Sequence, residues 1–283
     1  MADLTLATRG SPLALAQTKW VAGALTAAHP GLEVGILEVT TSGDVDRSSP
    51  IAALTETGAF VRGVQRAVLD GRADAAVHSA KDLPVEGPEG LVPVHPVREA
   101  PWDVLCGATL DDLPVGARVG TGSPRRAAQL WVLRPDLDVV PVRGNVGTRL
   151  GMVGRDVDAV VLAEAGLARL GRTDAIAERL GSESMVPAPA QAALCVEATT
   201  PDMIRLLEAI DHPATSRCVA IERRLLAVTG AGCRAALGAL AVEAGGAVEM
   251  VAFVDDEGGP RRTVATDHDD ARLVERVREG LGL

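Results

Sequence analysis

The chain has 283 residues and a formal net charge of −10, and 47% of its residues are hydrophobic. This length predicts two or three domains, and the acidic balance argues against a nucleic-acid or membrane-surface binder, which needs a basic face. No apolar run reaches the roughly 18 residues of a membrane span, and no signal-peptide pattern precedes the first strand pattern. We therefore expect a cytoplasmic protein that binds neither nucleic acid nor membrane.

The first half of the chain alternates strand and helix patterns. Short apolar runs are separated by longer stretches with helical spacing, and Pro12 stands at the first turn of one such stretch. The expected strands are 4–7, 32–39, 74–79 and 91–97, and the expected helices are 12–28 and 60–71.

A second alternating block and a different tail follow. Alternating strands and helices predict α/β units around mainly parallel sheets, whereas the tail predicts a small α+β domain. The block has expected strands at 117–120, 138–142 and 158–163 and expected helices at 123–133, 145–154 and 164–171. The tail has expected helices at 213–228 and 270–281 around antiparallel strands within 236–254 and 261–267.

Two stretches share one pattern of strand, Gly-Ser-Pro and helix, "TRGSPLALAQ" at 8–17 and "GTGSPRRAAQ" at 120–129. Ser11 and Ser123 are the expected N-caps, and the free N–H groups and the dipole at such a helix start favour an anion. The match is either a coincidence or the mark of two similarly built α/β domains, each offering a helix N-terminus to one cleft.

Arginines gather at or just past the carboxyl ends of expected strands, where open α/β sheets bind ligands. The corner at 120–130 lacks the ending of a P-loop and the third glycine of a dinucleotide fingerprint, and taken alone it reads as a capped helix with surface arginines. Several arginines together favour a ligand with several carboxylates, because guanidinium groups bind carboxylates bidentately. The arginines are Arg9, Arg125, Arg126, Arg143 and Arg149.

The stretch "HSAKDLP" at 78–84 places polar side chains in a turn after a buried strand. It is open to three interpretations. Asp82 could bond only to backbone, Ser79 and Lys81 could form a Ser-Lys hydrolase pair, or Asp82 could act as an acid/base carboxylate while Lys81 holds an acidic substrate. The hydrolase interpretation is weak, since the sequence identifies no oxyanion hole.

The four cysteines are widely spaced, without a CxxC pair or a Cys/His cluster, so we expect no metal site. Cys233, in "GAGCRAALG" at 230–238, follows small residues and precedes Arg234. It is either a small buried thiol or a reactive thiolate that a bulky group must reach. Cys106, Cys195 and Cys218 lie in apolar or helical contexts and are expected to be structural.

Taken together, these motifs resemble the hydroxymethylbilane synthase (porphobilinogen deaminase) family. The resemblance runs nearly end to end, through "ATRGSPLALAQ", "TSGD", "HSAKDLP", "GTGSPRRAAQL", "RGNVGTRL", "AGLARLG", "PAPAQAAL" and "GAGC". It implies two domains like type II periplasmic binding proteins around a cleft, plus a small C-terminal α+β domain. The implied limits are 1–98 with 189–211 for domain 1, 99–188 for domain 2 and 212–283 for domain 3.

The resemblance also implies a role for each motif. Asp82 would be the catalytic carboxylate, and Cys233 would carry a dipyrromethane cofactor through a thioether bond. The cofactor's acetate and propionate groups would be held by Ser79, Lys81, Ser123, Arg125, Arg126, Arg143, Gly144, Asn145 and Arg149. The incoming porphobilinogen would be held by Arg9, Ser11, Arg149, Arg169 and Gln191.

The implied activity is that of a transferase in tetrapyrrole biosynthesis. Porphobilinogen loses ammonia, the resulting methylenepyrrolenine is attacked by the terminal pyrrole of the chain on the cofactor, and hydrolysis frees linear hydroxymethylbilane. The product would pass to uroporphyrinogen III synthase, and the protein would be a monomer. Repeated use of the same arginines would require hinge motion between domains.

The sequence departs from the family pattern at a few positions. The segment 52–60 has Ala53 and Thr57 where lysines often occur, and Ala192 follows Gln191 where glycine is usual. The alternative of a non-catalytic paralogue that binds carboxylate ligands is therefore kept, and a Ser-Lys hydrolase is the weaker alternative.

Overall fold

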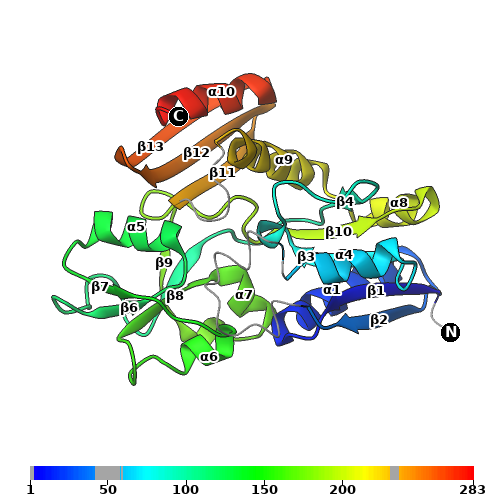
Figure 1. The fold of residues 1–283 in the computed structure, drawn as a ribbon, viewed down its shortest axis with the longest axis horizontal. Coiled ribbons are helices and arrows are strands. Elements are labelled where there is room, and N and C mark those ends of the chain that lie inside the picture. The colour runs from blue at the N-terminus through cyan, green and yellow to red at the C-terminus, as the bar shows by residue number, and fades with distance from the viewer. Residues whose placement is uncertain (1–2, 42–57, 59, 230–235) are drawn as a thin grey trace. The chain divides into compact units, whose positions relative to one another are not determined.

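The computed structural model describes residues 3–41, 58, 60–229 and 236–283 (Figure 1). The chain forms two compact units, of which the first contains 1–99 and 193–217 and the second contains 100–192 and 218–283. The chain therefore passes from one unit to the other more than once.

Unit 1 is built on a five-stranded sheet with the order β2-β1-β3-β10-β4. Strand β1 pairs in parallel with β2 and β3, while β10 is antiparallel to β3 and β4. β10 is thus the one reversed strand among those described. The strands are β1 (Leu4–Arg9), β2 (Val34–Val39), β3 (Ala75–Ser79), β4 (Val92–Val94) and β10 (Leu194–Ala198).

Helices cover both faces of this sheet, because successive strand residues point to opposite sides. Leu6 belongs to one apolar cluster, with Val21 and Leu25 of α1, and its neighbour Ala7 belongs to another, with Val64 and Val68 of α4. The helical segments are α1 (Pro12–Ala28), α4 (Arg62–Leu69), η1 (Ala80–Asp82), α8 (Pro201–Leu207) and η3 (Glu208–Ile210).

The second sheet, in unit 2, repeats the plan of the first with the order β7-β6-β8-β5-β9. Strand β6 is parallel to β7 and β8, and β5 is the reversed strand, antiparallel to β8 and β9. The strands are β5 (Asp103–Cys106), β6 (Arg118–Gly120), β7 (Asp138–Val140), β8 (Ala159–Ala163) and β9 (Ile176–Leu180). The helical segments are α5 (Pro124–Leu133), α6 (Val146–Leu150), α7 (Glu164–Arg169) and η2 (Thr173–Ala175).

The tail forms a three-stranded antiparallel sheet in the order β11-β12-β13. Residues of α9 and α10 share one buried cluster with this sheet, among them Leu225, Met250 and Leu273. Gly245 and Gly246, both at positive φ, form the turn that splits the expected strand region 236–254 into two strands. The elements are α9 (Pro213–Val228), β11 (Ala236–Ala244), β12 (Ala247–Asp256), β13 (Gly259–Asp267) and α10 (Asp270–Gly280).

The predicted fold class is confirmed, with two α/β sheets and a small C-terminal sheet. Both Gly-Ser-Pro stretches follow the strand that lies second in its sheet, so the two α/β sheets are similarly built, which is one of the two interpretations of the repeated pattern. The helix expected at 145–154 was too long, since α6 ends at Leu150 and a turn with two glycines follows. Among the described strands and α-helices, those that the sequence patterns did not predict are β5, β9, β10 and α8.

Candidate functional site

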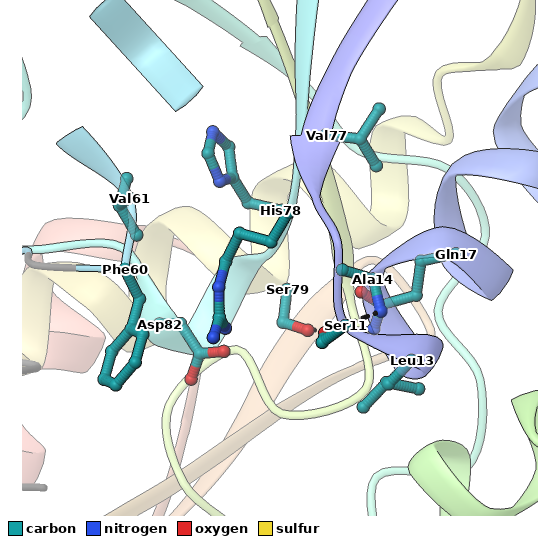
Figure 2. Close-up of a pocket in the computed structure, with 11 residues that line it drawn as sticks. Ser11, Leu13, Ala14, Gln17, Phe60, Val61, Val77, His78, Ser79 and Asp82 are labelled. Carbon is teal, nitrogen blue, oxygen red and sulfur yellow. Dashed lines mark hydrogen bonds between the residues drawn. The ribbon is translucent and has the colours of Figure 1, made fainter. Parts of the chain in front are cut away.

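In unit 1 a small pocket of about 60 Å³ lies at the carboxyl ends of β1 and β3 (Figure 2). Four residues that the sequence predicts for the site line it together, namely Arg9, Ser11, Ser79 and Asp82. Arg9 is the last residue of β1 and Ser79 the last of β3. The parallel pairing of these two neighbouring strands explains why residues about 70 positions apart meet at one sheet edge.

Two contacts fix the polar groups of this pocket. Ser11 is the N-cap of α1, where its Oγ accepts a hydrogen bond of 3.3 Å from the backbone N–H of Ala14. The Gln17 Nε2 donates to Ser79 Oγ at 2.8 Å, and Figure 2 shows the Ser79 side chain next to the start of α1. The Ser79 hydroxyl is therefore held by the same helix that presents Ser11.

Arg9 and Asp82 supply opposite charges to the same pocket. The Arg9 guanidinium lies over the Phe60 ring, 4.5 Å from its centroid, which is a cation–π contact. Asp82 ends the turn η1, whose first residue, Ala80, donates its N–H to the carbonyl of Ala193 at 3.0 Å. Lys81 lies in the same turn and is partly exposed.

A buried polar network beside the pocket was missed by the sequence patterns. His78, which also lines the pocket, places its Nε2 3.4 Å from Glu197 Oε2. The Gln65 Nε2 donates to the same carboxylate oxygen at 2.8 Å. All three are at most 7% exposed, so the carboxylate is shielded from water. The sequence feature that could have indicated this network is a glutamate inside the apolar run "LCVEA", which forms β10.

In unit 2, Ser123 caps α5 and its Oγ accepts from the Arg126 N–H at 3.4 Å. Arg125 and Arg126 are only 4% and 6% exposed, so the alternative of surface arginines is wrong. Both contact the fully buried carboxylate of Asp103, with Arg125 Nη2 at 2.8 Å and Arg126 Nη2 at 2.7 Å. In the described structure this carboxylate is the anion that the corner holds.

The segment from Arg143 to Arg149 contains a short loop and the start of α6. Asn145 caps that helix, and its Oδ1 accepts from the Thr148 N–H at 2.9 Å. The Arg149 Nε donates to the Gly144 carbonyl at 2.9 Å. Gly144 has φ of 103°, and a Cβ there would lie 2.6 Å from Thr148, so the tight turn requires glycine.

Two further predicted residues, Arg169 and Gln191, lie in the first segment of unit 2, residues 100–192. Arg169 is the last residue of α7, and its Nη2 donates to the Ala192 carbonyl at 2.6 Å. Gln191 is 1% exposed, and its Nε2 donates to the Pro101 carbonyl at 2.8 Å and to Asp103 Oδ1 at 2.9 Å. Gln191 therefore joins the same carboxylate as the two arginines of α5.

Other predicted features have these outcomes. Cys233 and residues 52–57 and 59 lie outside the described residues. Cys106, Cys195 and Cys218 are buried, as expected for structural cysteines. Among the described side chains, no group of three or more His, Cys, Asp or Glu could hold a metal ion. Of the helices that the structure describes, none has the length and apolarity needed to cross a membrane.

A family model described as porphobilinogen deaminase, dipyrromethane cofactor binding domain, matches residues 4–205. A porphobilinogen deaminase of Roseiflexus castenholzii is 47% identical over 247 residues, which cover 85% of this chain and 82% of that protein. The chain belongs to the porphobilinogen deaminase family. A porphobilinogen deaminase of Acidothermus cellulolyticus is 44% identical over 282 residues. The match covers 95% of this chain and 85% of that protein. As a family member, the chain is a transferase with a dipyrromethane cofactor.

Among solved structures, substrate-binding domain 2 of GlnP from Lactococcus lactis gives a TM-score of 0.45 at 11% identity. The match covers 80% of this chain and 90% of that one.

The residues of unit 2 fit the cofactor of the porphobilinogen deaminase family. A dipyrromethane with acetate and propionate groups needs cationic donors, and the start of α5 already binds a carboxylate, that of Asp103, through Arg125 and Arg126. Two guanidinium groups against one carboxylate leave an excess of one positive charge. An additional carboxylate is therefore compatible with this corner.

Proposed function

We propose that this chain is a hydroxymethylbilane synthase that deaminates porphobilinogen and joins four molecules head to tail. The proposal rests on membership of the porphobilinogen deaminase family. The observation that carries it is the pocket that Arg9 and Asp82 both line, because the reaction needs a cation for the substrate's carboxylates and a carboxylate for its proton transfers.

Within the proposal, each side chain has a role that its chemistry allows. Arg9 binds a carboxylate of the incoming porphobilinogen, with Ser11 beside it, and Arg149, Arg169 and Gln191 complete the substrate contacts. Asp82 stabilises positive charge that develops near pyrrole N–H groups, and its carboxylate takes up the proton that leaves the reacting carbon.

The dipyrromethane is proposed to be attached to Cys233, and when bound it supplies the nucleophilic pyrrole carbon. Arg125, Arg126, Arg143 and Arg149 bind its carboxylates, with Ser79, Lys81, Ser123, Gly144 and Asn145 assisting. These donors hold the group in place and keep its charges paired.

Intact mass spectrometry tests the proposal. Purified protein should exceed its sequence mass by one dipyrromethane, and a Cys233→Ser variant should show the sequence mass alone. A protein that carries no adduct and acquires none from porphobilinogen overturns the assignment. That result leaves a carboxylate-binding paralogue, and acylation of Ser79 by a serine-directed reagent would identify a hydrolase instead.

Asp82→Asn should keep the adduct and lose turnover. The amide preserves the size of the side chain but cannot accept a proton, so we expect a decrease in kcat of about 10²–10⁴-fold, the typical contribution of a general acid or base. The rate of hydroxymethylbilane formation measures it, with intact mass as the check on cofactor content. Near-normal product formation would remove Asp82 from the mechanism.

We also propose that the protein works as a cytoplasmic monomer and releases a product that uroporphyrinogen III synthase consumes. Sedimentation at several concentrations tests the monomeric state, because a monomer keeps one sedimentation coefficient at all of them. A coupled assay, in which added synthase must increase the yield of the cyclic product, tests the second point.

A further inference from the structure

The carboxylate of Asp103 is the centre of a buried cluster in unit 2. Asp103 is 0% exposed and is the first residue of strand β5. Arg126 donates to Oδ1 through Nε at 3.0 Å and through Nη2 at 2.7 Å. Gln191 Nε2 reaches the same oxygen at 2.9 Å, and Arg125 Nη2 lies 2.8 Å from Oδ2. Three side chains from two distant segments therefore converge on one carboxylate.

Backbone carbonyls hold the two guanidinium groups from the other side. Arg125 Nη1 donates to the Val186 carbonyl at 2.7 Å, and Arg126 Nη1 donates to the Val161 carbonyl at 2.9 Å. Each planar group is thus fixed at two points, one of which is Asp103. Removing the carboxylate would leave each guanidinium with a single anchor among the described residues, free to rotate about its own side chain.

Charge gives Asp103 a second effect. Burial lowers the pKa of Arg125, and the nearby Asp103 opposes that shift. The ion pairs that the structure describes for Arg125 and Arg126 are both with Asp103. The nearby Glu164 is engaged by Arg179. Two cations and one anion leave one positive charge, so the cluster can accept one ligand carboxylate without the cost of two unpaired buried cations.

We propose that Asp103 is a positioning residue, which orients Arg125 and Arg126 and sets their net charge so that they bind one carboxylate of the cofactor. The inference rests on the proposed function, since it takes the ligand of these arginines to be the dipyrromethane. Asp103 does not touch the reacting atoms in this proposal. It acts through the arginines alone.

Cofactor acquisition by the full chain tests the proposal. Protein made in cells that produce no porphobilinogen is mixed with porphobilinogen, and the rate of mass gain is measured at several concentrations. Asp103→Asn should slow this rate at least tenfold at low concentration. The matched control is Glu164→Gln, which removes another buried carboxylate paired with an arginine in the same unit and should leave the rate within twofold of the unsubstituted protein.

A double-mutant cycle separates positioning from a general loss of structure. In an Arg126→Gln background, Asp103→Asn should slow acquisition much less than it does alone, because one of the groups it positions is absent. An equal fold-change in both backgrounds, or an unchanged rate for Asp103→Asn, overturns the inference. Circular dichroism verifies that each variant is folded at the assay temperature.

A second variant covers the case in which Asp103→Asn does not fold. Asp103→Glu keeps the charge but lengthens the side chain by one methylene, which displaces the carboxylate from Arg125 and Arg126, and we expect a smaller decrease of about threefold. A rate equal to that of the unsubstituted protein would contradict the proposal. If the unsubstituted protein itself gains no mass, the proposed function fails, whereas a normal gain in both variants defeats only the role of Asp103.

Discussion

At the scale of single residues, backbone strain marks the segment around Gln191. Its two neighbours, Ala190 and Ala192, have φ of 61° and 69°, and they are the non-glycine residues with positive φ in the described part of the chain. A Cβ makes this conformation costly by roughly 1 kcal/mol or more. The hydrogen bonds of Gln191 and of the Ala190 N–H hold the segment in this strained geometry, in which the Gln191 amide reaches Asp103.

Ala192→Gly should therefore increase the free energy of unfolding by between zero and about 1 kcal/mol. The relief of backbone strain stabilises the folded state, whereas the greater chain entropy of glycine stabilises the unfolded state. The matched control is Ala193→Gly, a buried alanine without positive φ, which should destabilise by about 1 kcal/mol. Urea unfolding of both variants measures the difference. Equal destabilisation by both would show that the φ at residue 192 carries no strain.

A second prediction at this scale concerns the buried thiol of Cys106. Burial raises its pKa to about 11, against the opposing effect of Arg126. The thiol is neutral at pH 8, so iodoacetamide should leave it unmodified in the native protein and modify it in urea. Because the folded pKa lies above the unfolded value, its contribution to stability is complete below about pH 9 and decreases as the pH rises toward 11. Rapid modification of native Cys106 at pH 8, followed by peptide mass mapping, would contradict this.

At the scale of elements, the two Gly-Ser-Pro corners are equivalent. Each corner follows the strand that occupies the second position in the order of its sheet, which is β1 in unit 1 and β6 in unit 2. Each also has proline at the first turn of a helix and serine as the N-cap. The residues that follow differ, however. In α1 they are apolar, whereas in α5 they are the two buried arginines. The same local design thus presents different chemistry at the two helix starts.

Ser11→Ala and Ser123→Ala should each lower the free energy of unfolding by about 1 kcal/mol, the usual cost of losing an N-cap. Asparagine at either position should restore most of it, because its side chain also caps. Denaturant unfolding compares the four variants and their parent. A cost confined to one of the two corners would show that they are not equivalent in stability.

At the scale of the whole molecule, one buried carboxylate joins distant parts of unit 2. Glu222 of α9 is 0% exposed. Its Oε2 accepts from the Ala190 N–H at 2.5 Å and its Oε1 accepts from the Ala241 N–H at 2.8 Å. It therefore ties the strained segment around Gln191 to strand β11 of the C-terminal sheet. No local pattern in the sequence indicates this contact.

Glu222→Ala should destabilise the protein by about 2–4 kcal/mol, because two buried N–H groups lose their acceptor. Glu222→Gln should cost less, since its carbonyl oxygen still accepts one of the two bonds. Thermal unfolding measures both, and each kcal/mol corresponds to a decrease in Tm of about 2–4 °C at this size. A Tm within 1 °C of the parent for the alanine variant would exclude the role.

Most helices and the central strands could be predicted from local patterns. Helix 12–28 and helix 213–228 match α1 and α9 at both ends, because prolines and periodic apolar residues define them. Strands β5, β9 and β10 were missed. β5 and β10 are fully buried, so they show no alternation of polar and apolar residues, and β10 joins a sheet whose other strands lie about 100 or more positions earlier.

The candidate site divides in the same way. By itself, the sequence determined which residue types follow which strands, because local propensity and spacing decide those features. The arginines, Asp82 and the two helix starts could therefore be identified as candidate site residues from the sequence. Only the tertiary structure decided that Arg125 and Arg126 are buried against Asp103 and that Gln191 joins them. The physical reason is that a buried cation requires a partner, and the fold selects that partner from any part of the chain.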